Sequence, residues 1–162
     1  MTTAVLPLNP WLHPLNGGVS EISHNLEKMG AEIAESIRSI FWESRESIIT
    51  ELVVIYNEYS LPGWDGYDAL PVDEGSFIGA RQLINAIPDG VLSPELAPDT
   101  DGGISLDWRI GDEKLMSISV KGDSLVYAAI LGKDEKIHGK VRLASDKCPQ
   151  IIDTILTTHF VR

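Results

Sequence analysis

Residues 61–71 read Leu-Pro-Gly-Trp-Asp-Gly-Tyr-Asp-Ala-Leu-Pro, and this segment separates a helical half of the chain from a strand-rich half. Pro62 lacks a backbone N–H and restricts the residue before it, so a preceding helix must end near Ser60. Gly63 and Gly66 tolerate positive φ, which allows two turns within a few residues. We name residues 61–71 the hub loop, and we predict that it forms a corner between two structural regions.

The side chains of the hub loop admit two interpretations. Trp64 and Tyr67 have enough apolar area to anchor the loop on a core. The carboxylate of Asp65 is placed to accept hydrogen bonds from backbone N–H groups of its own turn. In the alternative, the Trp64-Asp65-Gly66-Tyr67 segment lines a pocket in which Asp65 or Asp68 meets a ligand. We favour the structural corner, because loops of this composition usually serve packing unless other polar groups converge on them.

The pentapeptide Gly-Trp-Asp-Gly-Tyr at residues 63–67, followed by Ala69 and Pro71, resembles a shared segment of small bacterial proteins. In those proteins the segment reads Trp-Asp-Gly-Tyr-Gly-Ala and a proline follows it. The resemblance runs from Pro62 to Leu143, and Asp68 stands where the group usually has glycine. Such proteins tend to consist of one domain and are encoded among mobile and defence-related genes. The resemblance therefore implies this genetic context, and it assigns no catalytic residue.

The composition is strongly acidic. The 162 residues include 24 acidic and 13 basic side chains, and the formal net charge is −11. This length fits one domain, here with an appended helical arm. A surface this negative argues against direct nucleic-acid binding, which needs clustered Lys and Arg. It suits a protein partner with a basic surface, including one whose basic groove holds DNA or RNA, although solubility alone also explains acidic surfaces.

The chain lacks the sequence features of a secreted or membrane protein. Cys148 is the single cysteine, so no internal disulfide is expected. The N-terminus has no basic region, and the apolar run at residues 4–8 is short and interrupted by proline. No stretch approaches the length of a membrane span. We predict a cytoplasmic protein that makes no membrane contact.

The first sixty residues divide into an arm and a helical region. Residues 1–18 are rich in proline and glycine, which predicts an extended arm. Residues 19–60 are predicted to be helical, because apolar residues recur there at spacings of three and four. One helix of about 40 residues would be about 60 Å long, which is long for this domain size. Either the helix breaks near Gly30 or residues 44–47 and forms an antiparallel pair, or it stays long and pairs with a copy or partner.

The outer face of this helical region is acidic, with eight glutamates against three basic residues. A charged face is usually only solvated, but this one is the first candidate for an interaction surface. We assign to that surface Glu32, Glu35, Glu43, Glu46 and Glu51. Charge reversal at Glu43 and Glu46 should slow association with a basic partner.

Residues 61–162 are predicted to form a compact α+β region. A short helix capped by Asp73 ends at residues 88–90, and the proline- and aspartate-rich residues 91–102 predict turns. A final helix begins at Pro149. Short connections predict an antiparallel four-stranded meander packed against helices. The third strand, residues 125–131, is apolar on both faces, as expected of a central strand. The four predicted strands are 104–110, 116–120, 125–131 and 137–143.

The sequence contains no recognisable catalytic or metal-binding motif. The four histidines lack metal-ligand spacing. A P-loop, a dinucleotide-binding glycine fingerprint and a nucleophile elbow are absent. Cys148, just before a proline, fits a partly buried residue better than a thiol nucleophile. We therefore predict no catalytic residue, no metal ligand and no cofactor.

Three hypotheses about function follow. The favoured one is a non-enzymatic acidic interaction module that binds and inhibits a nucleic-acid-handling protein, such as a nuclease or a CRISPR component. Antitoxins, immunity proteins and anti-CRISPR inhibitors act in this way. The second is an enzyme or small-ligand binder with its pocket at the hub loop. The third is a homodimeric scaffold held together through residues 20–59.

Overall fold

A computed structural model of the chain describes residues 18–144 and 147–161, and it excludes the side chains of residues 18–22 and 37–44. Backbone contacts divide the chain into two compact units, Met1–Arg38 and Ser39–Arg162. The predicted extended arm lies outside the described residues apart from Gly18, which begins the first helix.

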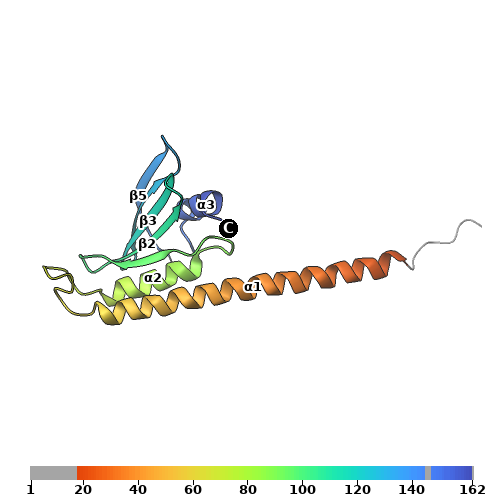
Figure 1. Cartoon of the computed structure of the whole chain (residues 1–162), viewed down its shortest axis with the longest axis horizontal. Coiled ribbons are helices and arrows are strands. Elements are labelled where there is room, and N and C mark those ends of the chain that lie inside the picture. Colours follow the sequence, from red (N-terminus) through yellow and green to blue (C-terminus); the bar gives the residue numbers. More distant parts are fainter. Residues whose placement is uncertain (1–17, 145–146, 162) are drawn as a thin grey trace, which may run out of the picture. The chain divides into compact units, whose positions relative to one another are not determined.

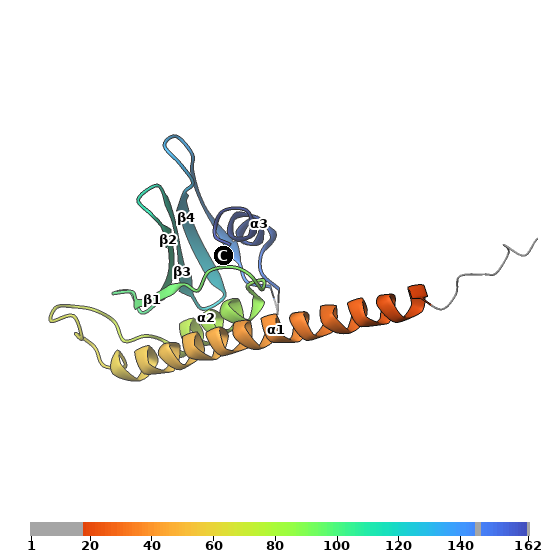
Figure 2. The same cartoon turned by 45° about the vertical axis from the view of Figure 1, so that its right-hand side comes forward.

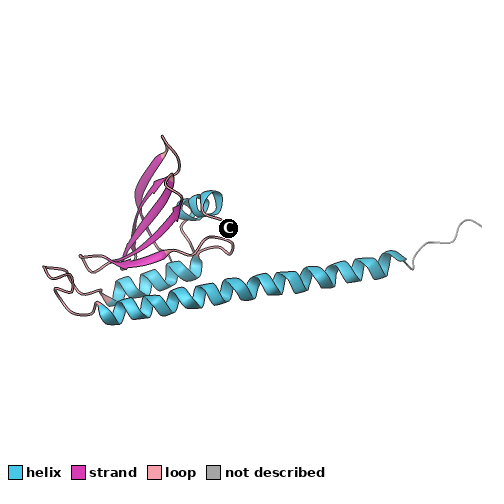
Figure 3. Ribbon diagram, viewed as in Figure 1, coloured by secondary structure: helices cyan, strands magenta, loops and turns pink. Residues whose placement is uncertain are grey.

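The protein is α+β, as predicted (Figure 1; Figure 3). In the described residues, three helices accompany one antiparallel sheet with the strand order β1-β2-β3-β4-β5. The predicted meander in sequence order is therefore confirmed, with one strand more than expected. The elements are α1 (Gly18–Glu58), α2 (Glu74–Ala86), β1 (Glu95–Pro98), β2 (Ile104–Ile110), β3 (Lys114–Lys121), β4 (Ser124–Ile130), β5 (Lys136–Arg142) and α3 (Gln150–His159).

Helix α1 is one continuous helix of 41 residues, so the predicted antiparallel helix pair is wrong. Gly30 lies inside the helix, and a Cβ placed on it would meet no atom within 4 Å. A glycine in a helix interior costs about 1 kcal/mol relative to alanine, which is too little to end a helix of this length. The helix instead ends at Glu58, shortly before Pro62, as the hub loop requires.

The additional strand is β1, in a segment predicted to be only turns. Its residues pair with β2 in an antiparallel register that runs from Glu95 opposite Asp107 to Pro98 opposite Ile104. Prolines at 94 and 98 suggested loop structure. An edge strand tolerates proline, however, because one side of its backbone makes no ladder hydrogen bonds, and β1 is an edge strand.

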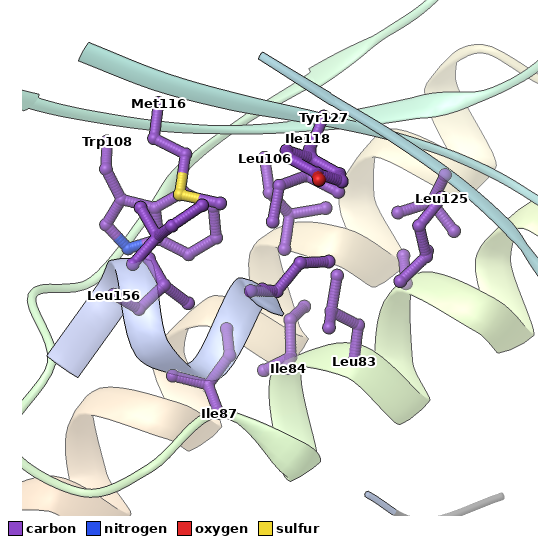
Figure 4. Close-up of a cluster of buried hydrophobic side chains, with 14 of the residues drawn as sticks. Leu83, Ile84, Ile87, Leu106, Trp108, Met116, Ile118, Leu125, Tyr127 and Leu156 are labelled. Atoms are coloured by element: carbon purple, nitrogen blue, oxygen red, sulfur yellow. The ribbon is translucent and has the colours of Figure 1, made fainter. Parts of the chain in front are cut away.

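The main core lies between one face of the sheet and the helices α2 and α3 (Figure 2). Alternate residues of β2, β3 and β4 point into it, among them Leu106, Ile118 and Leu125, which are fully buried. Figure 4 shows these side chains opposite Leu83 and Ile84 of α2, its C-cap Ile87, and Leu156 of α3. Burying side chains of this size contributes about 1.5–3 kcal/mol each before entropy is counted.

The later turns of α1 pack on α2, on the side away from the sheet. Leu52 is buried in the core cluster, and Ile55 is also buried. The rings of Tyr56 and Phe77 lie 4.7 Å apart between centroids, and Arg45 donates a 2.8 Å hydrogen bond to the carbonyl oxygen of Ile87. Residues 45–58 of α1 are thus part of the compact unit Ser39–Arg162.

Helix α2 begins where predicted and approaches the sheet closely. Asp73 caps it by accepting a 2.8 Å hydrogen bond from the backbone N–H of Ser76. The buried Ser76 hydroxyl donates to Asp73 at 2.7 Å and accepts from the N–H of Gly122 at 3.4 Å. A Cβ added to Gly79 would overlap with the carbonyl oxygen of Gly122, so only glycine allows this helix-to-turn contact.

Strand β4 is covered on one face only. Leu125, Tyr127 and Ala129 point into the core, whereas Val126 and Ile130 are exposed, and so is Ala128. The strand lies between β3 and β5, as expected of a central strand, but its second apolar face is not buried. Helices α2 and α3 lie on the other face of the sheet, and the outer face of β4 is left in solvent.

Candidate interaction surface on the first helix

Residues 23–36 of α1, named here the exposed segment, lie within the unit Met1–Arg38. All fourteen of their side chains are exposed. Leu26 is 64% exposed, and Met29 and Ile33 are each 57% exposed. Spacings of three and four place these three residues on one helix face. The exposed segment therefore presents an apolar stripe to solvent.

This stripe differs from ordinary surface hydrophobicity. Single exposed apolar residues are normal on protein surfaces, but aligned ones form a patch that usually marks an interaction site. The exposed segment therefore has an apolar face that a partner could bury.

Carboxylates flank the stripe on its two sides. A helix turns by about 100° per residue, so Glu32 lies roughly 90° from the centre of the stripe on one side. By the same geometry Glu27 lies roughly 130° from it on the other side, and Glu35 lies near the back of the helix. All three are exposed. Of the predicted acidic residues, Glu32 and Glu35 thus belong to this segment.

The other predicted acidic residues belong to the later part of α1. Glu46 and Glu51 are exposed on the turns that belong to the unit Ser39–Arg162. They are five residues apart and therefore about 140° apart around the helix, so they point to different sides of it. The side chain of Glu43 lies outside the described residues.

The hub loop is a hydrogen-bonded corner. Trp64 donates from Nε1 to the carbonyl oxygen of Leu70 at 2.9 Å, and its ring meets the ring of Tyr59 edge-on at 4.8 Å. Asp65 Oδ1 accepts from the N–H of Tyr67 at 2.9 Å and from that of Ala69 at 3.2 Å. Gly66 has φ of 83°, a conformation that suits glycine. These contacts are those of the predicted structural corner.

One prediction for this loop is wrong. Tyr67 is 85% exposed and does not anchor the loop on the core. Trp64 and the braced Asp65 complete the corner without it. The carboxylate of Asp65 receives its described hydrogen bonds from its own loop, so the four residues Trp64, Asp65, Gly66 and Tyr67 are held together by local packing.

The loop after β1 carries the carboxylates that sequence reasoning assigned to a turn. Asp99 accepts hydrogen bonds from the hydroxyls of Ser105 at 2.6 Å and Ser119 at 2.5 Å. Asp101 accepts from Lys121 Nζ at 3.0 Å, and this hydrogen bond lowers the pKa of the Asp101 carboxyl below its ordinary value of 3.8. Both aspartates thus connect this loop to the sheet.

Possible metal ligands, hollows and the cysteine bear on small-molecule chemistry. The described residues contain no group of three or more His, Cys, Asp or Glu side chains placed to hold a metal ion. Two hollows beside Arg45 each measure about 30 Å³, which is room for about one water molecule, and a more open hollow at the end of β4 measures about 280 Å³. Burial, with a smaller effect of Asp153, raises the pKa of the half-buried Cys148 thiol to about 12. That thiol is protonated at neutral pH and is a poor nucleophile.

Comparisons with known proteins add no family. The chain matches no protein-family profile, and searches among curated proteins and solved structures also found no match. No helix in the described ranges combines the length and the hydrophobicity that crossing a bilayer demands. The exposed segment, with its apolar stripe, is the candidate functional site. Sequence reasoning singled out its glutamates and missed Leu26, Met29 and Ile33 as surface residues.

Proposed function

We propose that the protein is a non-enzymatic interaction module that binds a partner protein through the exposed segment of α1. The observation that carries this proposal is the exposure of Leu26, Met29 and Ile33 on one helix face. These residues are spaced as i, i+3 and i+7, which is the anchor pattern of helices that bind in apolar grooves. The apolar stripe would fill such a groove.

The acidic flanks define the chemistry of the partner. Within residues 23–36, three glutamates accompany one lysine, and Glu27 and Glu32 lie on opposite sides of the stripe. They favour a groove with an apolar floor and a rim of Arg and Lys, which would also speed association by electrostatic attraction. The net charge of −11 would also attract a basic partner.

Basic surfaces of this kind are common on proteins that handle nucleic acid. The proposed activity is therefore inhibition of such a protein, a nuclease or a CRISPR component, by an antitoxin, immunity or anti-CRISPR type of inhibitor that acts in the cytoplasm. The resemblance of residues 63–67 to bacterial proteins encoded among mobile and defence-related genes supports this context. No direct contact between this chain and nucleic acid is needed.

The two other hypotheses receive less support. A homodimeric scaffold through residues 20–59 would bury the same stripe against its copy. Pairing two acidic helices would also bring like charges together, which is unfavourable. A ligand pocket at the hub loop would need polar groups from elsewhere to converge on Asp65, and the described hydrogen bonds of that carboxylate come from Tyr67 and Ala69 in the same loop.

A retention experiment with three variants tests the proposal. Full-length protein is immobilised and exposed to extract of the native host at low and high salt. The first variant, Leu26→Ser/Met29→Ser/Ile33→Ser, removes the stripe. The second, Glu27→Lys/Glu32→Lys, reverses the flanks. The matched control, His24→Ser/Ala31→Ser, changes two exposed residues on the opposite side of the same segment.

We expect the wild type and the matched control to retain the same basic protein and to release it at high salt. Both the stripe variant and the flank variant should retain it at least tenfold less. The purified retained protein should act on nucleic acid, and the wild type should inhibit it in proportion to binding. Equal retention by the stripe variant and the wild type would contradict the proposal.

A further inference from the structure

The outer face of the sheet, opposite α2 and α3, carries exposed apolar residues. Val126 is 50% exposed and Ile130 is 38% exposed. One solvated face is common in antiparallel sheets, so exposure alone indicates no binding. The arrangement of charges around these residues is what distinguishes this face.

Strand registers place a basic–apolar–apolar–basic row across four strands of this face. Arg109 of β2 lies opposite Leu115 of β3, which lies opposite Ile130 of β4, which lies opposite Lys136 of β5. Arg109 and Lys136 are exposed, and Leu115 is half-buried. Three strand spacings of about 4.8 Å make the row about 14 Å wide, which exceeds the diameter of about 10 Å of an α-helix.

The charge on this row is available to a partner. Among the described ion pairs, none involves Arg109 or Lys136. The chain also separates its charges along the sequence, with nine of its thirteen basic residues but only seven of its twenty-four acidic residues at positions 109–162. The acidic groups nearest to the row along its strands are Asp107 on β2, Asp112 and Glu113 in the turn before β3, and Asp134 and Glu135 directly before β5.

A hollow adjoins the row at the end of β4. Its volume is about 280 Å³, and it is lined by Ile130, Gly132, Lys133 and Lys136 and by the carboxylates Asp112 and Glu113. The hollow is open to solvent and mostly charged, with Ile130 as its apolar side chain. The face thus combines an apolar floor, basic residues on two sides and a recess.

We infer that this outer face binds the exposed segment of a second copy of the chain. The complementarity has two parts. The apolar stripe from Leu26 to Ile33 extends about 10 Å along the helix, and Val126 to Ile130 extends about 13 Å along β4. Glu27 and Glu32 lie on opposite sides of the stripe, as Arg109 and Lys136 lie on opposite sides of the apolar pair.

This inference rests on the proposed function, because it assigns a partner surface to the same exposed segment. It also adds a regulatory consequence. A copy that holds the exposed segment of another keeps the stripe covered, and a target protein with a more basic groove must displace it. Self-association and target binding then compete for Leu26, Met29 and Ile33.

Charge-swapped variants test the inference by sedimentation and light scattering of the full chain. The helix variant is Glu27→Lys/Glu32→Lys, and the sheet variant is Arg109→Glu/Lys136→Glu. The control, Arg81→Glu/Lys147→Glu, changes two other exposed basic residues. Circular dichroism verifies that each variant is folded.

We expect the wild type and the control to associate, and the helix and sheet variants to associate at least tenfold more weakly when each is alone. Mixing those two variants should restore association, because the reversed helix of one then meets the reversed sheet of the other. A wild type that stays monomeric at all concentrations would overturn the inference and leave the retention experiment to judge the proposed function.

Two other outcomes also count against it. Association that the sheet variant leaves unchanged, but that Leu26→Ser/Met29→Ser/Ile33→Ser abolishes, would show that two helices pair directly. Failure of the mixture to associate while both variants remain folded would show that the two charged surfaces do not meet.

Discussion

Two parts of α1 share one apolar pattern and have opposite environments. In residues 45–58, Leu52 is fully buried and Ile55 is buried. In residues 23–36, Leu26 and Met29 occupy equivalent spacings and are exposed. The same 3.6-residue periodicity thus builds a core in one part and a solvent-exposed stripe in the other.

The difference shows that periodicity identifies a face and not what covers it. The later turns of α1 have α2 beside them, with Tyr56 against Phe77 and Arg45 bonded to Ile87. The exposed segment has the same kind of face, and its side chains meet solvent. The proposed partner from outside the chain would cover this stripe.

The largest predicted effect compares one leucine from each part. Leu52→Ala should lower the free energy of unfolding by about 2–5 kcal/mol, because it leaves a cavity in the core. Leu26→Ala should change it by less than about 0.5 kcal/mol, as exposed substitutions usually do. Urea denaturation followed by tryptophan fluorescence measures both. Similar losses for the two variants would mean that Leu26 is buried in the free protein.

Two glycines sharpen the comparison at a smaller scale. Gly79→Ala should destabilise the protein by about 1–3 kcal/mol, because the added Cβ overlaps with the carbonyl oxygen of Gly122. Gly30→Ala should stabilise the helix around it by about 1 kcal/mol, since no atom lies within 4 Å of the new Cβ. Thermal unfolding measures the first change and hydrogen exchange of residues 23–36 the second. Faster hydrogen exchange in Gly30→Ala than in the wild type would show that the added Cβ does not stabilise the helix.

The smallest predicted effect concerns the ion pair between Asp101 and Lys121. The folded-state pKa of Asp101 is lowered, chiefly by the hydrogen bond from Lys121. The stabilisation is therefore complete above about pH 4, the unfolded range of an aspartate, and is lost as the pH falls through the lowered folded-state pKa. Because both side chains are more than half exposed, Asp101→Asn should cost less than about 1 kcal/mol at pH 7.

Denaturation of the wild type and Asp101→Asn at pH 7 and pH 3 measures this linkage. The stability difference between the two proteins should shrink at pH 3, where protonation weakens the wild-type ion pair. A difference that grows on acidification would contradict the sign of the pKa shift.

Much of the fold was predictable because local signals agreed with tertiary packing. Asp73 caps α2 as its sequence indicates, and residues 104–110, in which apolar and polar residues alternate, form β2. Strand β1 was not predicted, because its prolines resemble a loop and only pairing with β2 makes it a strand. The central position of β4 was predictable from its apolar residues, but those residues do not reveal which of its two faces lacks a cover.

The candidate site was predictable only in part. The acidic character of α1 is visible in the sequence, and Glu32 and Glu35 lie in the exposed segment. The apolar stripe was not distinguishable from the core pattern at Leu52 and Ile55, since both have helical spacing. Tyr67 resembled an anchor because of its size, and only the completed corner around Asp65 shows that the ring is left outside.

Site-specific photocrosslinking tests the central claim most directly. A benzophenone amino acid is placed at position 29 of the exposed segment and, as a control, at position 58, which is an exposed residue at the end of the same helix. Irradiation of host cells should give crosslinked species from position 29, to a basic protein or to a second copy, and essentially none from position 58. Equal and low crosslinking at the two positions would contradict the assignment of residues 23–36 as an interaction surface.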